Sequence, residues 1–501
     1  MLRPRHSGFI LAAIVVVTIA IFSACNKSGD AGSSASASDG GKIPVTTKSE
    51  DARKEFLEGQ SLADRLLGQE SIQHFDKAIA LDPDFASAEM ARANNSPTAE
   101  EFFEHLKKAV SLADKTSPGE KLVILSGQAA TNGDATKQKE DLDQLVAAYP
   151  NDERAQFALG NYYFGQQDLP PAIEHFKKAS EIAPNFSGTY NSLGYAYRQQ
   201  GDYSNAEQAF KKYIELIPND PNPYDSYAEL LLKMGRFDDS ITQYRKALTI
   251  DPHFVPSHFG LSAALMYSGK ADAAKTELQT MISQARNDGE TRLALFGLCV
   301  VAADGGKMDE SLKEIDKEYA VAEKKSDVAA MAADLQAKGL ITLETGKYDA
   351  AAKIYDHSLQ LIEGSSQSQE IKDNAKLIHH FNLATVDIGK KDLASAKTEA
   401  AEFQKGAEAS KNPAQVKLWH ELAGRLALAQ KDYDTALTEL AQGNQQDPRN
   451  LYRLAQAYEG KGEATKAHEL YTQAAGFNSL PQLNYSFIRT KAWKLASGKQ
   501  A

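Results

Sequence analysis

The spacing of the prolines constrains this chain more than any other feature. Six prolines lie at nearly equal intervals: Pro83, Pro118, Pro150, Pro184, Pro218 and Pro252. The intervals are 35, 32, 34, 34 and 34 residues. Because a proline ring does not fit inside a helix, regularly spaced prolines indicate helices that end at the same place in each copy of a repeated unit. We therefore expect an array of short helical repeats, for which 501 residues leave ample length.

Small and aromatic residues recur inside these intervals. One repeat has Leu159, Gly160, Tyr163, Ala172, Phe176, Ala179 and Pro184. The next has Leu193, Gly194, Tyr197, Ala206, Phe210 and Pro218, and the third has Tyr227, Ala228, Leu231, Ser240, Tyr244, Ala247 and Pro252. This pattern resembles the tetratricopeptide repeat. The resemblance implies an all-α fold, in which pairs of antiparallel helices, A and B, stack into a superhelical solenoid.

The same pattern, in places degenerate, extends over residues 51–484 and gives about eleven or twelve repeats. We expect the small residue of helix A, such as Gly194, to face a small residue of helix B, such as Ala206. The aromatic residues, such as Phe210, are then expected to fill the space between neighbouring repeats. A polar stretch at 283–291 divides the array into an N-terminal part, 51–286, and a C-terminal part, 287–480.

The tail, residues 481–501, has an amphipathic pattern with apolar residues at Leu483, Phe487, Ala492, Trp493 and Leu495. The open end of a solenoid needs a cover. A capping helix is the favoured interpretation, and a helix that binds a partner is the alternative.

Residues 1–24 resemble a bacterial lipoprotein signal peptide. Arg3 and Arg5 precede a 14-residue apolar run, which suits a signal-peptide core and is short of the ~20 residues that span a bilayer. The run ends in "FSAC", although Phe22 stands where Leu, Val or Ile is usual. The resemblance implies cleavage before Cys25 and attachment of lipid to it. A secreted protein and an uncleaved membrane anchor are the alternatives.

Residues 25–50 are rich in Gly, Ser and Ala, and predict a flexible linker after the lipidated cysteine. Asn26 follows Cys25, so the Asp that retains lipoproteins in the inner membrane is absent. The expected location is the cell envelope, at the outer membrane and facing the periplasm.

Composition and motifs favour no catalytic chemistry. A net charge of −11 excludes the broad basic face that nucleic acid requires. The chain has no phosphate-binding glycine loop, no nucleophile elbow and no zinc-protease motif. His253 and His258 have no third ligand nearby, and Cys299 lies in an apolar run where a buried thiol is expected. We predict a protein without enzyme activity, cofactor or metal.

Recognition is the expected function, because solenoids bind ligands on an extended concave surface. In tetratricopeptide proteins helix A lines that surface. Its residues outside the repeat signature are the candidate binding residues: Arg154, Phe157, Asn161, Phe164, Asn191, Tyr195, Arg198, Asn222, Asp225, Glu229, Phe259 and Met266. Arginine and amide side chains bind peptide groups and carboxylates, and aromatic residues and methionine give adaptable apolar contacts. The lysines of the clamp that holds acidic chaperone tails are missing, and Tyr195 replaces one of its asparagines.

The sequence therefore predicts a membrane-anchored scaffold that binds proteins or peptides at the bacterial envelope, in the assembly of an envelope complex. A glycan-binding or nutrient-binding lipoprotein is the alternative. Sugar sites favour exposed tryptophans, and the chain has only Trp419 and Trp493. An envelope hydrolase is the least favoured reading, since almost no chain remains for a catalytic domain.

Overall fold

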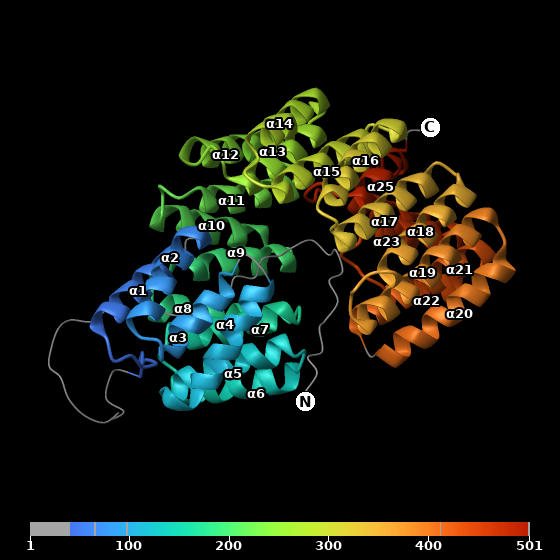
Figure 1. The fold of residues 1–501 in the computed structure, drawn as a ribbon. Helices are drawn as coiled ribbons and strands as arrows, with labels where there is room; N and C mark the ends of the chain where they lie inside the picture. Colours follow the sequence, from blue (N-terminus) through green and yellow to red (C-terminus); the bar gives the residue numbers. More distant parts are fainter. Residues whose placement is uncertain (1–40, 65–66, 97–98, 411, 499–501) are drawn as a thin grey trace. The chain divides into compact units, whose positions relative to one another are not determined.

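The structure is a computed structural model that describes residues 41–64, 67–96, 99–410 and 412–498 (Figure 1). All regular elements in these ranges are helices, as predicted. The predicted signal peptide, Cys25 and the linker up to residue 40 lie outside the described residues. In the described part of the chain, no helix combines the length and the apolar character needed to cross a membrane.

The chain forms two compact units, whose described parts are residues 41–230 and 231–498, here the N-terminal and the C-terminal unit. The boundary falls inside α11 (Pro221–Lys233), between Leu230 and Leu231. The division predicted at residues 286 and 287 stays a prediction.

In the N-terminal unit, consecutive helices pack as five pairs. These helices are α1 (Glu50–Asp64), α2 (Gly68–Leu81), α3 (Ala86–Asn94), α4 (Ala99–Leu112), α5 (Pro118–Thr131), α6 (Ala135–Ala148), α7 (Glu153–Gly165), α8 (Leu169–Ile182), α9 (Ser187–Gln200) and α10 (Tyr203–Leu216), with a 3₁₀ turn at Ala113–Lys115.

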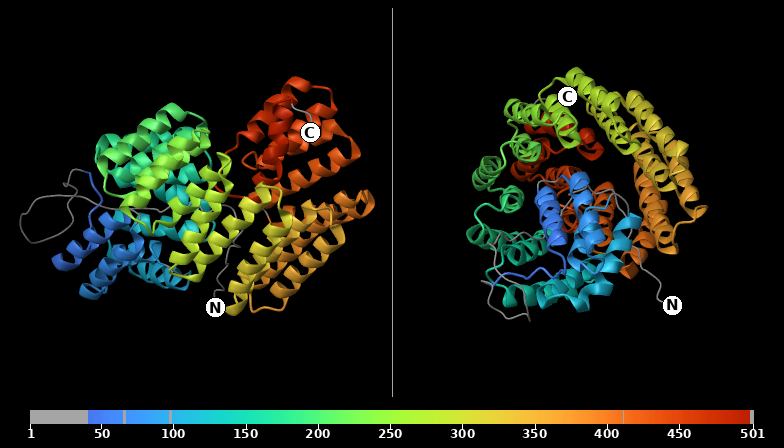
Figure 2. Two further views of the ribbon diagram at one scale, coloured as in Figure 1. Left: turned by 90° about the horizontal axis from the view of Figure 1, so that it is seen from above. Right: turned by 60° about the vertical axis from the view of Figure 1, so that its left-hand side comes forward.

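The C-terminal unit begins its helices with α12 (Phe237–Ile250) and continues as six further pairs and one last helix (Figure 2). They are α13 (Val255–Tyr267), α14 (Ala271–Gln284), α15 (Asp288–Asp304), α16 (Met308–Lys324), α17 (Val328–Glu344), α18 (Tyr348–Glu363), α19 (Gln369–Lys390), α20 (Leu393–Ser410), α21 (Pro413–Gln430), α22 (Tyr433–Gln442), α23 (Pro448–Gly460), α24 (Ala464–Ala475) and α25 (Leu483–Ala496). Odd-numbered helices up to α23 are helix A of a repeat, and even-numbered helices are helix B.

The turn between helix A and helix B repeats with the period of the sequence. A left-handed backbone recurs every 34 residues at Gly133, Gln167, Gly201, Gly235 and Gly269. Glycine adopts this conformation without the steric cost that a Cβ brings. Gln167 takes the same conformation, with φ of 61°, so the fold imposes this turn even where glycine is absent.

The signature glycine of helix A contacts an aromatic ring of helix B in its own repeat. A Cβ added to Gly194 would lie 2.5 Å from Cε1 of Phe210, and one added to Gly160 would lie 2.7 Å from Cδ1 of Phe176. The predicted facing of Gly194 and Ala206 stays a prediction, since the three nearest atoms all belong to the ring of Phe210. The glycine is small because the ring of its own repeat lies directly on it.

The predicted linker ends too late, because residues 42–49 are bound to the N-terminal unit. The amide of Ile43 donates to Oδ2 of Asp152 at 2.9 Å, and its side chain is buried. The amide of Thr46 donates to Glu120 at 2.9 Å, and the hydroxyl of Thr47 donates to Asp82 at 2.6 Å. Unlike the Gly and Ser run before it, this stretch carries apolar and β-branched side chains that gain from burial. It crosses the start of α5 and α7 and so links successive repeats.

Candidate binding faces

Three of the predicted residues form one cluster on helix A of two consecutive repeats in the N-terminal unit. The hydroxyl of Tyr195 donates to Oε2 of Glu229 at 3.0 Å, and Arg198 pairs with the other oxygen of Glu229 at 2.5 Å. The guanidinium of Arg198 also lies 4.7 Å from the centre of the Tyr195 ring. Burial, and then the charge of Glu229, raise the pKa of Tyr195 well above its usual value, so the phenol stays a neutral donor.

Several other predicted residues are buried and serve the packing of the array. Arg154 is 3 % exposed, and it pairs with Asp64 at 2.8 Å. Burial raises the pKa of that Asp64, although Arg154 opposes the shift. Asn222 is also buried and donates to the hydroxyl of Tyr213 at 2.9 Å. Six of the predicted residues are buried, and their part in binding a ligand stays a prediction: Arg154, Phe157, Asn161, Asn222, Asp225 and Met266.

Phe164 and Phe259 are partly buried. Phe164 lies 6.5 Å from the ring of Phe176, and Phe259 approaches Gly297 in the next repeat of the C-terminal unit. Both rings therefore keep some surface that a ligand can contact, and both remain candidates.

Two amides of the N-terminal unit have hydrogen-bonding capacity that no described residue uses. Nδ2 of Asn161 on α7 and Oδ1 of Asn191 on α9 are shielded from solvent and have no hydrogen-bond partner. Leaving such an atom unpaired costs about 1–3 kcal/mol. The two asparagines belong to neighbouring A helices, one offering a donor and the other an acceptor, which are the two groups that a peptide backbone pairs with.

In the C-terminal unit, the chain's own last helix lies on helix A of several repeats. Helix α25 packs on α24 and also contacts α15, α17 and α23 (Figure 1). Nε of Arg489 donates to Asp304 at the end of α15 at 2.6 Å. Tyr485 is fully buried against the ring of Tyr267, at 5.5 Å between centres. Lys491 lies 3.6 Å from Glu344 on α17.

The predicted capping helix therefore exists, but covering the end of the array is only part of its role. It fills part of the inner side of the C-terminal unit. The predicted apolar face is also corrected at its far end, because Trp493 is 52 % exposed and Leu495 is 42 % exposed.

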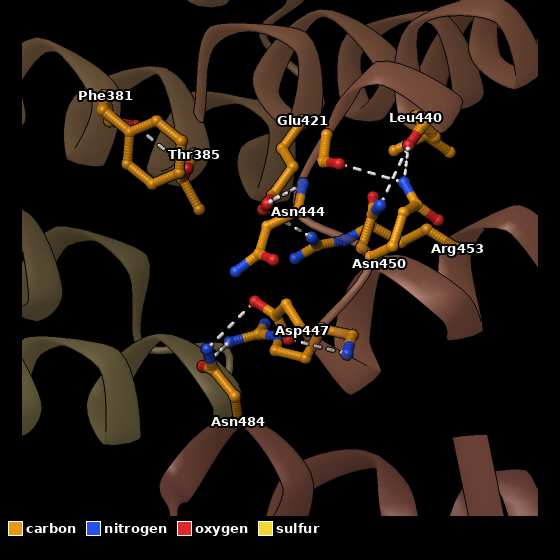
Figure 3. A network of polar contacts seen from close by, with 12 residues as sticks. Phe381, Thr385, Glu421, Leu440, Asn444, Asp447, Asn450, Arg453 and Asn484 are labelled. Carbon is orange, nitrogen blue, oxygen red and sulfur yellow. Dashed lines mark hydrogen bonds and ion pairs between the residues drawn. The ribbon is translucent and has the colours of Figure 1, made fainter. Parts of the chain in front are cut away.

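A polar network beside α25 contains three arginines that sequence reasoning missed, and Figure 3 labels one of them, Arg453. Arg449 on α23 pairs with Glu344 at 2.6 Å. Arg453 lies 3.7 Å from Glu421. Arg425 on α21 lies 5.8 Å from the ring centre of Phe381 and has no hydrogen bond or ion pair among the described residues.

A signal for one of these arginines is present in the sequence. Arg425 directly follows the signature glycine Gly424, just as Asn161 and Tyr195 follow Gly160 and Gly194. The candidate residues were chosen from the four best-matching repeats, which end before α15. Extending the same register to every recognised repeat would have found Arg425.

Burial shifts the pKa of three ionisable side chains in this network. Burial, followed by repulsion from Asp447, raises the pKa of Glu421 to about 6. Burial, followed by repulsion from Arg449, lowers the pKa of Arg453 to about 10. Burial and then the charges of Arg453 and Arg449 also lower the pKa of Arg425 well below its usual value. The shifts of the two arginines share one cause, which is that burial and neighbouring positive charges both disfavour the charged guanidinium.

Metal-binding groups do not converge in the described part of the chain. No group of three or more His, Cys, Asp or Glu residues there could hold a metal ion. His258 instead hydrogen-bonds Glu277 of the same repeat and the carbonyl of Pro252. Cys299 is buried as expected, and burial raises its pKa to about 12, so its thiol is unreactive at neutral pH.

Family models described as "Tetratricopeptide repeat" match residues 130–185, 188–220 and 231–296. The search of curated proteins gave no match. Among solved structures, a tetratricopeptide repeat protein from Parabacteroides merdae is 16 % identical, with 54 % of this chain and 98 % of that chain covered and a TM-score of 0.39.

Two further solved structures are similar over shorter stretches. The MamA protein is 22 % identical over 33 % of this chain and 91 % of its own, with a TM-score of 0.30. PilW, a type IV pilus biogenesis factor, is 16 % identical over 40 % of this chain and 92 % of its own, with a TM-score of 0.35. At these identities and TM-scores, none of the three carries an argument about function.

Proposed function

The chain is a tetratricopeptide repeat protein, and from this premise we propose that it is a non-catalytic scaffold that binds segments of other proteins. Proteins of this repeat class are typically interaction scaffolds, and solenoids bind through the face that their stacked helices form. The proposed ligand in the N-terminal unit is a peptide segment that lies across helices α7, α9 and α11.

The two unpaired amides of Asn161 and Asn191 carry this proposal. A peptide backbone supplies a carbonyl for the free N–H of Asn161 and an N–H for the free oxygen of Asn191. The cluster of Tyr195, Arg198 and Glu229 stands next along the same helices and holds its polar groups in fixed positions. Such prior ordering lowers the entropy that binding must overcome.

We extend the proposal to an anchor at the cell envelope. Its support is the sequence alone: Arg3 and Arg5, the apolar run after them, and Cys25 directly after small residues. Acyl chains on Cys25 would hold the protein at the membrane with about 0.8 kcal/mol for each buried methylene. The proposed site is the outer membrane, facing the periplasm, where a scaffold would serve the assembly of an envelope complex.

Photo-crosslinking in native membranes tests the scaffold. A photoreactive amino acid replaces Asn191 on the candidate face and, as the matched control, Lys178 on the outward-facing part of helix α8, whose side chain is 47 % exposed. We expect discrete protein adducts from position 191 and none of the same size from position 178. Identical adducts from both positions, or none from either, would contradict binding on this face.

The anchor is tested separately with Cys25→Ala. We expect this variant to leave the membrane fraction and to appear in the soluble fraction. Retention in the membrane fraction would show that lipid on Cys25 is not the anchor.

The glycan-binding alternative loses one of its two candidate platforms. Trp419 is partly buried and packs against the core formed by α19, α20 and α21. Trp493 alone is widely exposed. One tryptophan makes a weaker sugar platform than several, and the peptide proposal stays the better supported of the two.

A further inference from the structure

Arg425 and Arg453 of the C-terminal unit have donor groups that their neighbours do not use. A guanidinium carries five N–H donors. Arg425 makes no hydrogen bond or ion pair among the described residues, and Arg453 makes only the 3.7 Å contact with Glu421. The side chain of Arg453 is 12 % exposed. A buried guanidinium ion lowers the stability of the fold unless a group of opposite charge pairs with it.

The carboxylates close to these arginines are already engaged. Glu421 accepts from the amide of Asn444 at 3.1 Å. Asp447 caps helix α23 by accepting from the amide of Arg449 at 2.8 Å, and it accepts from Asn484 at 3.1 Å (Figure 3). Glu344 is shared between Arg449 and Lys491. Among the described residues, each of these three carboxylates therefore has a hydrogen-bond or ion-pair partner other than Arg425.

The structure also indicates what kind of molecule lies on this face. The chain's own α25 rests beside the arginines and presents polypeptide groups to them. Oδ1 of Asn484 accepts from Nη1 of Arg449 at 3.3 Å, and the ring of Phe487 lies 5.8 Å from the same guanidinium. Arg449 is therefore contacted by a peptide segment, helix α25, whereas Arg425 and Arg453 are not.

Phe381 on α19 completes the surroundings of Arg425. Its ring centre lies 5.8 Å from the guanidinium carbon, within the ~6 Å over which a ring attracts a cation. A ring on one side leaves the edge of the planar group for a bidentate acceptor, and a carboxylate matches that edge with two parallel hydrogen bonds.

We propose that Arg425 and Arg453 bind a carboxylate of an acidic peptide segment of a partner protein, which lies on α21 and α23 beside α25. The inference rests on the proposed scaffold function and specifies the ligand class of its C-terminal unit. The donors are guanidinium groups on the last two repeats, and no lysine takes part. A carboxylate placed there would supply the missing counter-charge.

Fluorescence anisotropy with the full-length protein tests the inference. The probes are a labelled peptide of alternating Glu and Ala residues and its counterpart with Gln in place of Glu. We expect the Glu peptide to bind at least about tenfold more tightly, a difference of about 1.4 kcal/mol. Arg425→Gln should weaken binding of the Glu peptide about tenfold. Arg425→Lys should recover part of the loss, because it keeps the charge without the bidentate edge.

Arg286→Gln is the matched control, since it removes the same charge from a side chain that is 61 % exposed and paired with Glu290. It should leave the affinity unchanged. Circular dichroism should show that Arg425→Gln keeps its helices, because it removes an unpaired charge and no internal bond. Equal affinity of the wild type and Arg425→Gln, or of the Glu and Gln peptides, would overturn the inference.

Inorganic phosphate serves as a competitor. The concentrations of phosphate and of unlabelled Glu peptide that displace the labelled peptide are compared. If the two concentrations are equal, a free anion is the ligand and the inference is overturned. The photo-crosslinking at position 191 reports on the scaffold independently. If position 191 gives adducts but the Glu peptide does not bind, only this inference is contradicted. If position 191 gives no adducts and the Glu peptide does not bind, the proposed function is contradicted as well.

Discussion

The N-terminal and C-terminal units are built from the same pair of helices, but each uses its non-repeat segment differently. In the N-terminal unit, residues 42–49 bind the residues at the start of α5 and α7. In the C-terminal unit, α25 lies on the inner helices themselves. The two non-repeat segments therefore contact different parts of the repeats, the helix ends in one unit and the A helices in the other.

The difference has a physical origin in the two segments. Residues 42–49 form a short extended segment, and its amides and hydroxyls bind the buried carboxylates of Glu120 and Asp82 at the ends of helices. Helix α25 carries large side chains, including Tyr485 and Phe487, which are stable only when another apolar surface covers them. A helix of this kind needs the broad face of several helices, whereas an extended strand needs only a line of acceptors.

The largest expected effect is the loss of stability in Tyr485→Ala. This variant tests whether α25 is an integral part of the C-terminal unit. The side chain is fully buried, and its hydroxyl donates to the carbonyl of Ala475. Truncating a buried aromatic residue costs about 3–5 kcal/mol. Hydrogen exchange should show α15 and α25 losing protection together, while α7 and α9 keep theirs.

Trp493→Ala on the same helix is the control. Its side chain is 52 % exposed, so its loss should change the free energy of unfolding by less than about 1 kcal/mol. If both variants behaved alike, α25 would be a loosely attached tail and the contrast between the two units would disappear.

Much of the fold could be predicted from the sequence because the repeat signature reports contacts inside one repeat and with its neighbours. Gly194, Phe210 and Pro218 recur for this reason, and they predicted the helices and their ends correctly. The contacts of Tyr485 with Tyr267, and of Ile43 with Asp152, join residues far apart in the sequence and do not belong to the repeat signature. A periodic pattern contains no information about such single contacts.

The candidate residues show the same limit. The register of helix A placed Tyr195 and Glu229 on neighbouring helices correctly, as their hydrogen bond shows. It could not distinguish a groove residue from a buried one, because both occupy the same face of a helix. Arg154 looked like a ligand contact in sequence, and only its distant partner Asp64 shows that it is internal.

Ile43→Ala tests the N-terminal side of the comparison and should have a smaller effect. Its side chain is 4 % exposed, and shortening a buried isoleucine costs about 2–5 kcal/mol, with the low end expected on an extended segment at a surface. We expect residues 42–49 to become accessible to protease while the C-terminal unit melts as before. Lys48→Ala, whose side chain is 85 % exposed, is the control and should leave cleavage unchanged.

The smallest expected effect is a change of stability with pH. It should differ between the two units because their buried charges differ. In the N-terminal unit Arg154 faces the carboxylate of Asp64. In the C-terminal unit Arg292 faces two carboxylates, with Asp334 at 2.7 Å and Glu318 at 3.2 Å. Burial, and then the charge of Asp334, raise the pKa of Glu318 to about 8. One positive charge cannot stabilise two buried negative charges, so the pair holds a proton at neutral pH.

The direction of the pH effect follows from this proton. The folded unit keeps it up to about pH 8, whereas the unfolded chain releases it near the ordinary value of 4.5. Stability of the C-terminal unit should therefore fall as pH rises through that window. Glu318→Gln, which cannot ionise, should lose most of this dependence, so that its melting temperature exceeds that of the wild type by a few degrees at pH 9 but not at pH 5. An equal decline with pH in both proteins would place the buried proton elsewhere.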